Sequence, residues 1–487
     1  MGISSVKFGA LSPTWRVRAM TRYHEGMNVP TTRFAPSPSG LLHLGNARTA
    51  LFSLLAALPD GRFLLRIEDS DRARASPVFE HALRADLAWL GFAAHIDEAA
   101  VWRQSERGAV YDDFLQKLAR DNLVYPCFCT ESELAAERAS QRARGLPPRY
   151  GGRCAALDPA AALARVAAGG AAVWRFRVPP GQEVTFCDVV RGPQRVATSL
   201  LGDFVVRRAQ GEAMFFFANA LDDALSGVTL VLRGEDHLAN TPRQILILRA
   251  LGLPVPEYGH LPLVLSAGGV PLSKRDGAGS LAALREEGFL PLAVINYLAR
   301  LGAVVGSERL LPLMDLAQAF DRRRIGHAPA RYDREQLLHW QRVAMAGTPV
   351  TEWLPWVAEY VPEADRLRFV EAVRPNALFP EDFRRWAGIV YGERRTLDED
   401  ARAAIGAAGA EFFRVAAAHL DAGGAAGDLP TVLKAAGHGG RRLFHGLRAA
   451  LTGRLAGPEL KDILALMPRA LVARRLLECG STDAQDL

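Results

Sequence analysis

The fold can be predicted outward from RFAPSPSGLLHLGN, residues 33–46. A strand-like segment (29–36) runs into a Pro/Gly turn, and a helical pattern follows at 43–58. The start of such a helix offers free N–H groups and the positive end of the helix dipole, which suit phosphate. Gly45 would let a ligand approach the backbone, and His43 and Asn46 can donate hydrogen bonds to phosphate oxygens. An ordinary strand–helix turn capped by His43 explains the same residues, so both interpretations stay open here.

The flanking segments repeat the strand–helix order. Residues 62–67 (RFLLRI) are typical of a buried strand, and Ser76-Pro77 of a helix start. Alternation returns at 228–233 (VTLVLR) and at a helix around 242–251. This order predicts an α/β fold with a parallel sheet and crossover helices.

The middle and the C-terminal half of the chain differ from this pattern. The middle mixes short strands, an Arg-rich helix and a Gly/Ala-rich stretch, which indicates an inserted domain, and helical patterns dominate after about residue 308. The predicted parts are a basic extension expected to be disordered (1–28), two halves of a Rossmann-type domain (29–109 and 213–270), an α+β insertion (110–212), a connecting region (271–335) and an all-α part (336–487). Met27 leaves open that the extension reflects a start codon assigned too early.

Composition excludes several classes of protein. The 487 residues are 49% hydrophobic and 23% charged, which is ordinary globular usage and excludes a wholly disordered, collagen-like or coiled-coil chain. No run of about 18 apolar residues predicts a membrane span. Five cysteines in a chain of this length do not make a disulfide scaffold. The net charge of +6 is compatible with a nucleic-acid partner without requiring one.

Two further segments carry charged side chains suited to a nucleotide. PLSKRDG (271–277) places Lys274 on a Gly-rich loop that can reach a triphosphate and close over it. LRGEDH (232–237) places charges at the carboxyl end of a strand, where open parallel sheets bind ligands. Taken alone, each is better explained as a solvated loop or a surface ion pair.

Together these segments resemble the class I aminoacyl-tRNA synthetases, most closely the bacterial glutamyl-tRNA synthetases. Residues 43–46 (HLGN) look like the HIGH signature of that family, and 272–275 (LSKR) like its KMSKS loop. The resemblance runs from about residue 29 to the end, with further matching segments at 33–38, 66–72, 233–243, 328–333 and 451–460. It implies a Rossmann-type catalytic domain, an inserted domain for the tRNA acceptor end and a helical anticodon-binding part.

The implied function is glutamate–tRNA ligase activity, in which ATP with Mg²⁺ and L-glutamate give glutamyl-adenylate and the glutamyl group passes to tRNA(Glu), releasing AMP and pyrophosphate. The resemblance also implies a cytoplasmic monomer without membrane contact. Two alternatives stay open: a paralogue that charges tRNA(Gln) preferentially or in addition, and a catalytically weakened tRNA-binding paralogue.

The resemblance assigns roles to single residues. The residues assigned to glutamate are Arg33, Ala35, Ser37, Glu68, Phe215, Asn219 and Arg233. Those assigned to ATP are His43, Asn46, Glu235, Ser273, Lys274 and Arg275, and those assigned to catalysis are His43, Gly45, Asn46 and Lys274. Two positions depart from the family pattern: Pro271 stands where a Lys is common, and Phe215, expected on a strand with Asn219, stands where a Tyr is common. Loss of the hydroxyl would weaken the glutamate pocket by about 1.5–3 kcal/mol.

Three cysteines in the predicted insertion indicate a metal site. Cys127-Phe-Cys129 is followed after a long gap by Cys154, three thiols that suit a structural zinc site, and the resemblance implies Tyr150 as the fourth ligand. Reduced, metal-free cysteines are the alternative. Cys187 and Cys479 are expected to be buried or incidental singletons.

The helical part is expected to contact RNA. Its paired arginines, such as Arg384-Arg385 and Arg474-Arg475, are candidates for phosphate contact, and its tryptophans, Trp340, Trp353, Trp356 and Trp386, are candidates for stacking on bases. Solvated helix faces and core packing are the respective alternatives.

Overall fold

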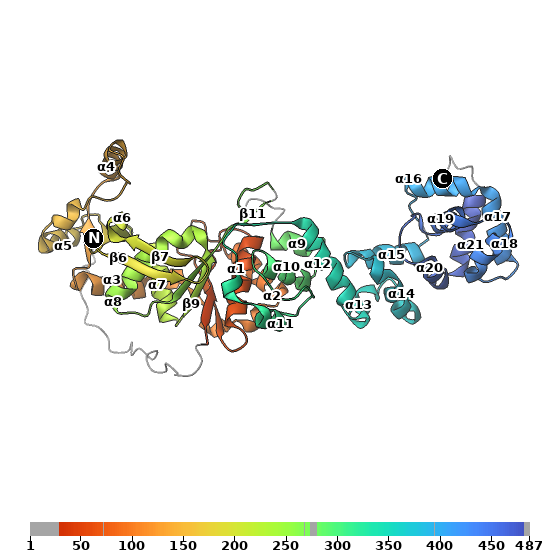
Figure 1. The fold of residues 1–487 in the computed structure, drawn as a ribbon, viewed down its shortest axis with the longest axis horizontal. Coiled ribbons are helices and arrows are strands. Elements are labelled where there is room, and N and C mark those ends of the chain that lie inside the picture. The colour runs from red at the N-terminus through yellow and green to blue at the C-terminus, as the bar shows by residue number, and fades with distance from the viewer. Residues whose placement is uncertain (1–28, 72, 267, 273–279, 394, 482–487) are drawn as a thin grey trace, which may run out of the picture. The chain divides into compact units, whose positions relative to one another are not determined.

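The structure is a computed structural model that describes residues 29–71, 73–266, 268–272, 280–393 and 395–481. Its chain divides into two compact units, described here separately (Figure 1). The first comprises the chain up to residue 282 together with 298–332, and the second comprises 283–297 and 333–487. The predicted extension (1–28) and the loop residues Ser273, Lys274 and Arg275 lie outside the described residues.

The predicted strand–helix–strand start of the first unit is confirmed. β1 (Thr31–Phe34) pairs in parallel with β2 (Arg62–Ile67), and α1 (Leu44–Ala57) connects them. Successive residues of both strands are buried, so both faces are covered, as expected for a sheet between helices. β2 also pairs with β3 (Trp102–Arg103), and α2 (Pro77–Trp89) begins at the predicted Ser-Pro pair.

A four-stranded sheet in the order β7-β6-β10-β9 completes the core of this unit. The strands are β6 (Glu183–Asp188), β7 (Gly192–Ala197), β9 (Leu230–Gly234) and β10 (Glu257–Leu261). β10 pairs in parallel with both β6 and β9, so β6 and β7 share a sheet with β9 although they lie within the predicted insertion. Thr229 N donates to the carbonyl of Thr31 at 2.9 Å, which brings β9 alongside β1.

A separate antiparallel sheet, in the order β4-β5-β8, lies within residues 110–212. Its strands are β4 (Val124–Cys127), β5 (Val173–Phe176) and β8 (Phe204–Arg207). The helices in and before this segment are α3 (Gly108–Arg120), α4 (Glu131–Ala143), α5 (Pro159–Ala167) and α6 (Thr198–Leu201). Strands and helices therefore mix here as the sequence predicts.

One predicted element is wrong. Phe215 and Asn219 lie on a helix, α7 (Phe215–Leu225), and not on a strand. The run of phenylalanines is typical of a strand. In α7, however, every residue from Phe217 to Asp223 is buried. A short helix that is buried on all sides lacks the amphipathic period by which a helix is predicted. α8 (Thr241–Leu251) follows β9, as predicted.

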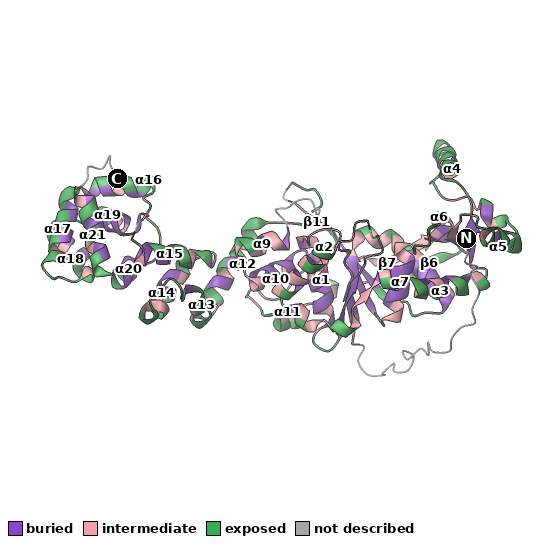
Figure 2. Cartoon of the chain, turned by 180° about the vertical axis from the view of Figure 1, so that it is seen from behind, coloured by how far each residue is buried: buried purple, intermediate pink, exposed green. Residues whose placement is uncertain are grey.

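The second unit is helical. Its longer helices are α12 (Arg334–Gly347), α13 (Val350–Val357), α14 (Arg366–Val373), α15 (Glu381–Tyr391), α16 (Glu399–Ala408), α17 (Ala410–Asp421), α18 (Leu429–Ala435), α19 (Gly440–Thr452), α20 (Leu460–Leu466) and α21 (Arg469–Ser481). Buried and exposed residues both occur along these helices (Figure 2), and the buried apolar residues of several helices pack into one hydrophobic core. The other α-helices and strands of the described residues are α9 (Leu281–Glu287), α10 (Pro291–Arg300), α11 (Leu313–Ala319), β11 (Val264–Leu265) and β12 (Ala330–Arg331). No helix in the described ranges is long and apolar enough to cross a membrane.

Candidate active site

A cavity of about 810 Å³ opens at the carboxyl ends of β1 and β9 in the first unit. This is the edge at which open parallel sheets bind ligands. The predicted site residues that line it are Arg33, Ala35, Ser37, His43, Gly45, Asn46, Glu68, Phe215, Asn219 and Arg233. The topology therefore brings together residues that lie up to 200 positions apart in the sequence.

Glu235 does not join this group. Its carboxylate accepts a hydrogen bond from the amide of Leu263 at 2.9 Å and forms an ion pair with Arg191. The next two residues, Asp236 and His237, line the cavity instead. The side chain of Glu235 is thus held against the loop after β10, and its predicted contact with ATP stays a prediction.

His43 combines the two interpretations of its turn. Its Nδ1 accepts hydrogen bonds from the amides of Gly45 (3.1 Å) and Asn46 (3.3 Å), so the ring caps α1 and also lines the cavity. Because Nδ1 is an acceptor, the proton of the neutral ring sits on Nε2. A Cβ at position 45 would lie 3.0 Å from the ring, so the glycine makes room for this cap as well as for a ligand. Asn46 Oδ1 is buried and has no hydrogen-bond partner among the described residues.

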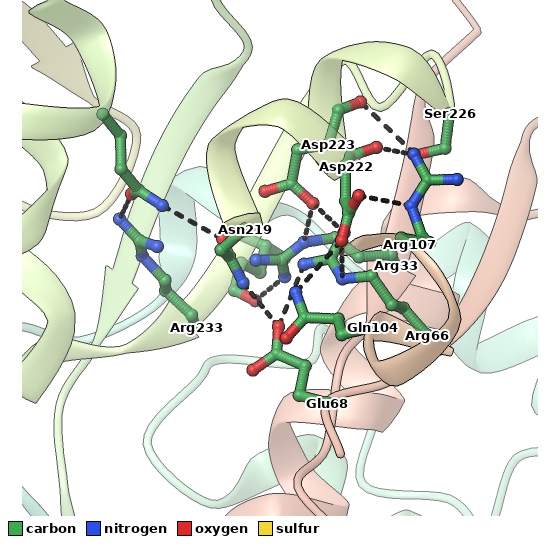
Figure 3. A network of polar contacts seen from close by, with 12 residues as sticks. Arg33, Arg66, Glu68, Gln104, Arg107, Asn219, Asp222, Asp223, Ser226 and Arg233 are labelled. Atoms are coloured by element: carbon green, nitrogen blue, oxygen red, sulfur yellow. Dashed lines mark hydrogen bonds and ion pairs between the residues drawn. The ribbon is translucent and has the colours of Figure 1, made fainter. Parts of the chain in front are cut away.

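Two buried arginines share one carboxylate beneath the cavity (Figure 3). Asp223 Oδ1 accepts from Arg33 Nε at 3.1 Å and from Arg66 Nη1 at 2.5 Å. The neighbouring carboxylate of Asp222 accepts from Arg107 Nε at 2.7 Å. Burial opposes ionisation of Asp223, but the two guanidiniums outweigh it and hold the pKa of Asp223 below its usual range. The network thus fixes Arg33 at the cavity wall with its charge largely offset.

Glu68 and Asn219 extend this network toward the cavity. Glu68 Oε1 accepts from Arg66 Nη2 at 3.1 Å and from the side-chain amide of Asn219. The carbonyl oxygen of Asn219 accepts in turn from Gln244 Nε2 at 3.1 Å, which fixes the orientation of the amide. Burial raises the pKa of Glu68, against the lowering effect of Arg66 and Arg33. A carboxylate held in this way suits an ammonium group.

Arg233 has one buried guanidinium nitrogen without a hydrogen-bond partner among the described residues. Its Nε donates to His260 Nε2 at 3.2 Å, and its Nη2 donates to Thr241 Oγ1 (2.7 Å) and to Gln244 Oε1 (2.6 Å). Its Nη1 is buried and has no hydrogen-bond partner within the described ranges. Burial lowers the pKa of Arg233 to about 10, which leaves the guanidinium charged at pH 7. An unpaired, charged and buried donor at a cavity wall suits a carboxylate ligand.

Phe215 and His237 form another wall of the cavity. Their rings stack with centroids 5.1 Å apart and an interplanar angle of 27°. Burial lowers the pKa of His237 to about 4, so this wall is uncharged at neutral pH.

Sequence reasoning missed the residues that hold the site from behind. Asp222, Asp223, Gln244 and His260 do not stand out in the sequence, because their partners lie on other elements. The one available signal is the pair of acids in the otherwise apolar helix FFFANALDDAL, since charges there need buried partners.

The predicted metal ligands lie together in the first unit. The sulfur atoms of Cys127, Cys129 and Cys154 all lie within 4.8 Å of one another. The Tyr150 hydroxyl is 3.4 Å from Cys127 Sγ and 3.7 Å from Cys129 Sγ, and Cys129 Sγ is 3.7 Å from Cys154 Sγ. A tetrahedral zinc ion with bonds of about 2.3 Å separates its ligands by about 3.8 Å, so this donor set fits zinc. Among the other cysteines, Cys187 is exposed and Cys479 is buried.

In the helical unit, burial narrows the candidates for RNA contact. Trp340, Trp353 and Trp386 are buried, whereas Trp356 is 57% exposed. Arg475 is fully buried and donates to the carbonyls of Ile389, Leu451 and Gly392. Core packing therefore accounts for most of the tryptophans and for Arg475, and leaves Trp356 as a stacking candidate.

Comparison with known proteins covers nearly the whole chain. Residues 30–339 match the family model described as tRNA synthetases class I (E and Q), catalytic domain, and residues 350–479 match that of an anticodon binding domain. The chain is 50% identical to glutamate–tRNA ligase 2 of Alkalilimnicola ehrlichii over 91% of this chain and 96% of that protein. It is 48% identical to glutamate–tRNA ligase 1 of Halorhodospira halophila over 93% of this chain and 97% of that protein.

Solved structures show the same similarity. A glutamate–tRNA ligase from Elizabethkingia meningosepticum, crystallised with its amino acid, superposes with a TM-score of 0.80 at 28% identity, over 93% of this chain and 99% of that one. The glutamate–tRNA synthetase of Elizabethkingia anophelis gives the same TM-score at 29% identity, over 93% of this chain and all of that one.

Proposed function

The chain belongs to the class I tRNA synthetases of the glutamate and glutamine group and attaches glutamate to tRNA at the expense of ATP, and we propose that its cavity carries out the chemistry as follows. The observation that supports this assignment most directly is the buried, unpaired Nη1 of Arg233 at the cavity wall. Relatives at 50% identity carry the name glutamate–tRNA ligase, which does not favour the catalytically weakened paralogue.

Arg233 and Arg33 bind the side-chain carboxylate of glutamate. Glu68, held by Arg66 and Asn219, receives the α-ammonium group. Ala35, Ser37 and Phe215 complete the pocket walls. This arrangement leaves the α-carboxylate directed toward the start of α1.

Activation is an in-line displacement. A glutamate α-carboxylate oxygen forms a bond to the α-phosphorus of ATP. The bond between this phosphorus and the oxygen that links it to the β-phosphate breaks, and pyrophosphate leaves with that oxygen. His43, with its proton on Nε2, and Asn46 at the start of α1 stabilise charge on the phosphates, and Mg²⁺ accompanies ATP as part of the substrate. From the loop outside the described ranges, Lys274 and Arg275 are proposed to add positive charge and Ser273 a hydroxyl donor.

In the second step a ribose hydroxyl at the 3′ end of tRNA attacks the acyl carbon, and AMP leaves. Neither step needs a covalent enzyme nucleophile, so catalysis consists of positioning and charge stabilisation. We assign residues 110–212 to the acceptor end, 271–335 to the KMSKS-like loop and the tRNA stem, and 336–487 to the anticodon, and we expect a cytoplasmic monomer.

Structural zinc is proposed at Cys127, Cys129, Tyr150 and Cys154. Burial raises the pKa of Cys129 to about 11, so a thiolate at neutral pH needs a cation beside it. The ion would tie β4 to the loop that carries Cys154 and stiffen this part of the fold.

The function is tested by ATP–pyrophosphate exchange with glutamate, with and without tRNA. Glutamate-dependent exchange is expected, and its absence under both conditions would refute the assignment. Charging assays with purified tRNA(Glu) and tRNA(Gln) then define tRNA specificity: similar rates would indicate an enzyme that accepts both, and a strong bias an enzyme that discriminates.

A further inference from the structure

Three adjacent strands place Asp188, His260 and Arg233 in a row. β10 lies between β6 and β9, and the pairing sets Tyr258 opposite Asp188 and His260 opposite Arg233. The side chains of Asp188 and His260 are fully buried. His260 is not among the residues that line the cavity, but it contacts Arg233, which is.

Hydrogen bonds fix the first part of this row. Asp188 Oδ1 accepts from the backbone amides of Val190 (2.9 Å), Arg191 (2.8 Å) and His260 (3.2 Å), which orients the carboxylate. Its Oδ2 forms a hydrogen bond with His260 Nδ1. Because a carboxylate in three backbone hydrogen bonds is ionised, Nδ1 carries the proton of this bond.

The other ring nitrogen of His260 must be an acceptor. Arg233 can only donate, so Nε2 accepts from Arg233 Nε at 3.2 Å. Thr241 Oγ1 lies 2.9 Å from Nε2 and accepts from Arg233 Nη2, so with Nε2 unprotonated its hydroxyl can share the one lone pair of Nε2 as a second donor. His260 is therefore the neutral tautomer protonated on Nδ1. Burial lowers the pKa of His260 against the raising effect of Asp188, which agrees with a neutral ring.

The neutral ring keeps Asp188 from neutralising Arg233. Arg33 forms an ion pair with Asp223 at 3.1 Å, whereas Arg233 forms no ion pair among the described residues. A carboxylate in direct contact with Arg233 would compete with a carboxylate ligand for the same donors. Asp188 instead fixes the orientation of the His260 imidazole, and the imidazole fixes that of Arg233. The positive charge of Arg233 therefore stays available to a ligand.

We propose that His260 is a positioning residue for glutamate binding, which directs Nη1 of Arg233 into the cavity by presenting an unprotonated Nε2 to Arg233 Nε. The inference rests on the proposed function, in which Arg233 binds the substrate carboxylate. It adds a residue outside the cavity to the determinants of glutamate affinity.

Two substitutions of His260 separate its hydrogen bond to Asp188 from its hydrogen bond to Arg233. In His260→Asn the side-chain amide can still donate to Asp188 but does not reach Arg233, whereas in His260→Gln the longer side chain can present an oxygen near the position of Nε2. KM for glutamate and for ATP is measured in the charging reaction with the full-length enzyme, and unfolding midpoints are recorded. We expect His260→Asn to raise KM for glutamate about tenfold or more with KM for ATP within twofold, and His260→Gln to recover most of the loss.

Equal KM values for glutamate in the two variants, whether both normal or both raised, would overturn the proposal. The Arg233→Lys variant separates this failure from failure of the proposed function: if it leaves KM for glutamate unchanged, the role of Arg233 itself is wrong. ¹⁵N spectra of histidine-labelled wild-type enzyme give an independent test that holds even if His260→Asn does not fold. The resonance absent from His260→Gln should show a protonated Nδ1 and a bare Nε2, and a protonated Nε2 would overturn the proposal.

Discussion

Replacement of Arg233 by Lys should raise KM for glutamate strongly. A guanidinium has five N–H donors, and in Arg233 three of them serve His260, Thr241 and Gln244, which leaves the two on Nη1 for a ligand. An ammonium group keeps the charge but cannot fill the same positions and also reach the ligand. Loss of a charged hydrogen bond costs about 1.5–3 kcal/mol, which corresponds to an increase in KM of about 10- to 150-fold.

The assay is ATP–pyrophosphate exchange with tRNA present, in which glutamate is varied at saturating ATP and ATP is varied at a fixed high glutamate concentration. Only KM for glutamate should rise, with KM for ATP within twofold. Arg195→Lys is the matched control, because Arg195 lies on β7 of the same sheet with a side chain that is 75% exposed. A KM for glutamate within twofold of wild type, or equal increases for glutamate and ATP, would refute the assignment of Arg233 to the substrate carboxylate.

Three further predictions concern the cavity wall and the cysteine cluster. Phe215→Tyr adds a hydroxyl to a ring that already lines the pocket. A hydrogen bond from this hydroxyl to a charged group would lower KM for glutamate by about tenfold or more, and an unchanged KM in the exchange assay would contradict this. Because the pKa of His237 is about 4 when folded and near 6.5 when unfolded, the unfolded state takes up its proton first as the pH falls, so stability is lost between about pH 6.5 and 4. With a discount for a ring that is about one-third exposed, the free energy of unfolding should fall by about 1 kcal/mol more in wild type than in His237→Gln between pH 7 and pH 5. Urea titrations at both pH values measure this difference, and identical pH slopes for the two proteins would rule it out. Purified enzyme should contain one zinc ion per chain by elemental analysis and Cys154→Ser much less, whereas Cys187→Ser, which alters the exposed cysteine, should keep the metal; equal content in the two variants would exclude the proposed ligands.

The elements that contact the ligand could be predicted, because their signals are local. Turn residues after β1 mark the start of α1, and the apolar run of β2 marks a buried strand, so their bounds follow from the sequence to within a few residues. Family motifs then point to Arg33, Glu68 and Arg233. α7 escaped prediction because both of its faces are buried, which hides its helical period. The hydrogen-bond partners of Glu235, Arg191 and the amide of Leu263, could not be predicted, because only the fold brings them to it.

The hydrogen bond between Thr229 and Thr31 implies an order of events during folding. These residues are 198 positions apart, and their contact is what sets Arg33 and Arg233 at one cavity. Closing a flexible loop of that length costs about 5 kcal/mol in chain entropy, so we expect the contact to form after the intervening segments have folded and shortened the effective loop. A nascent chain that has not yet reached β9 therefore lacks half of its glutamate site, and bound glutamate would tie together the two ends of this long loop.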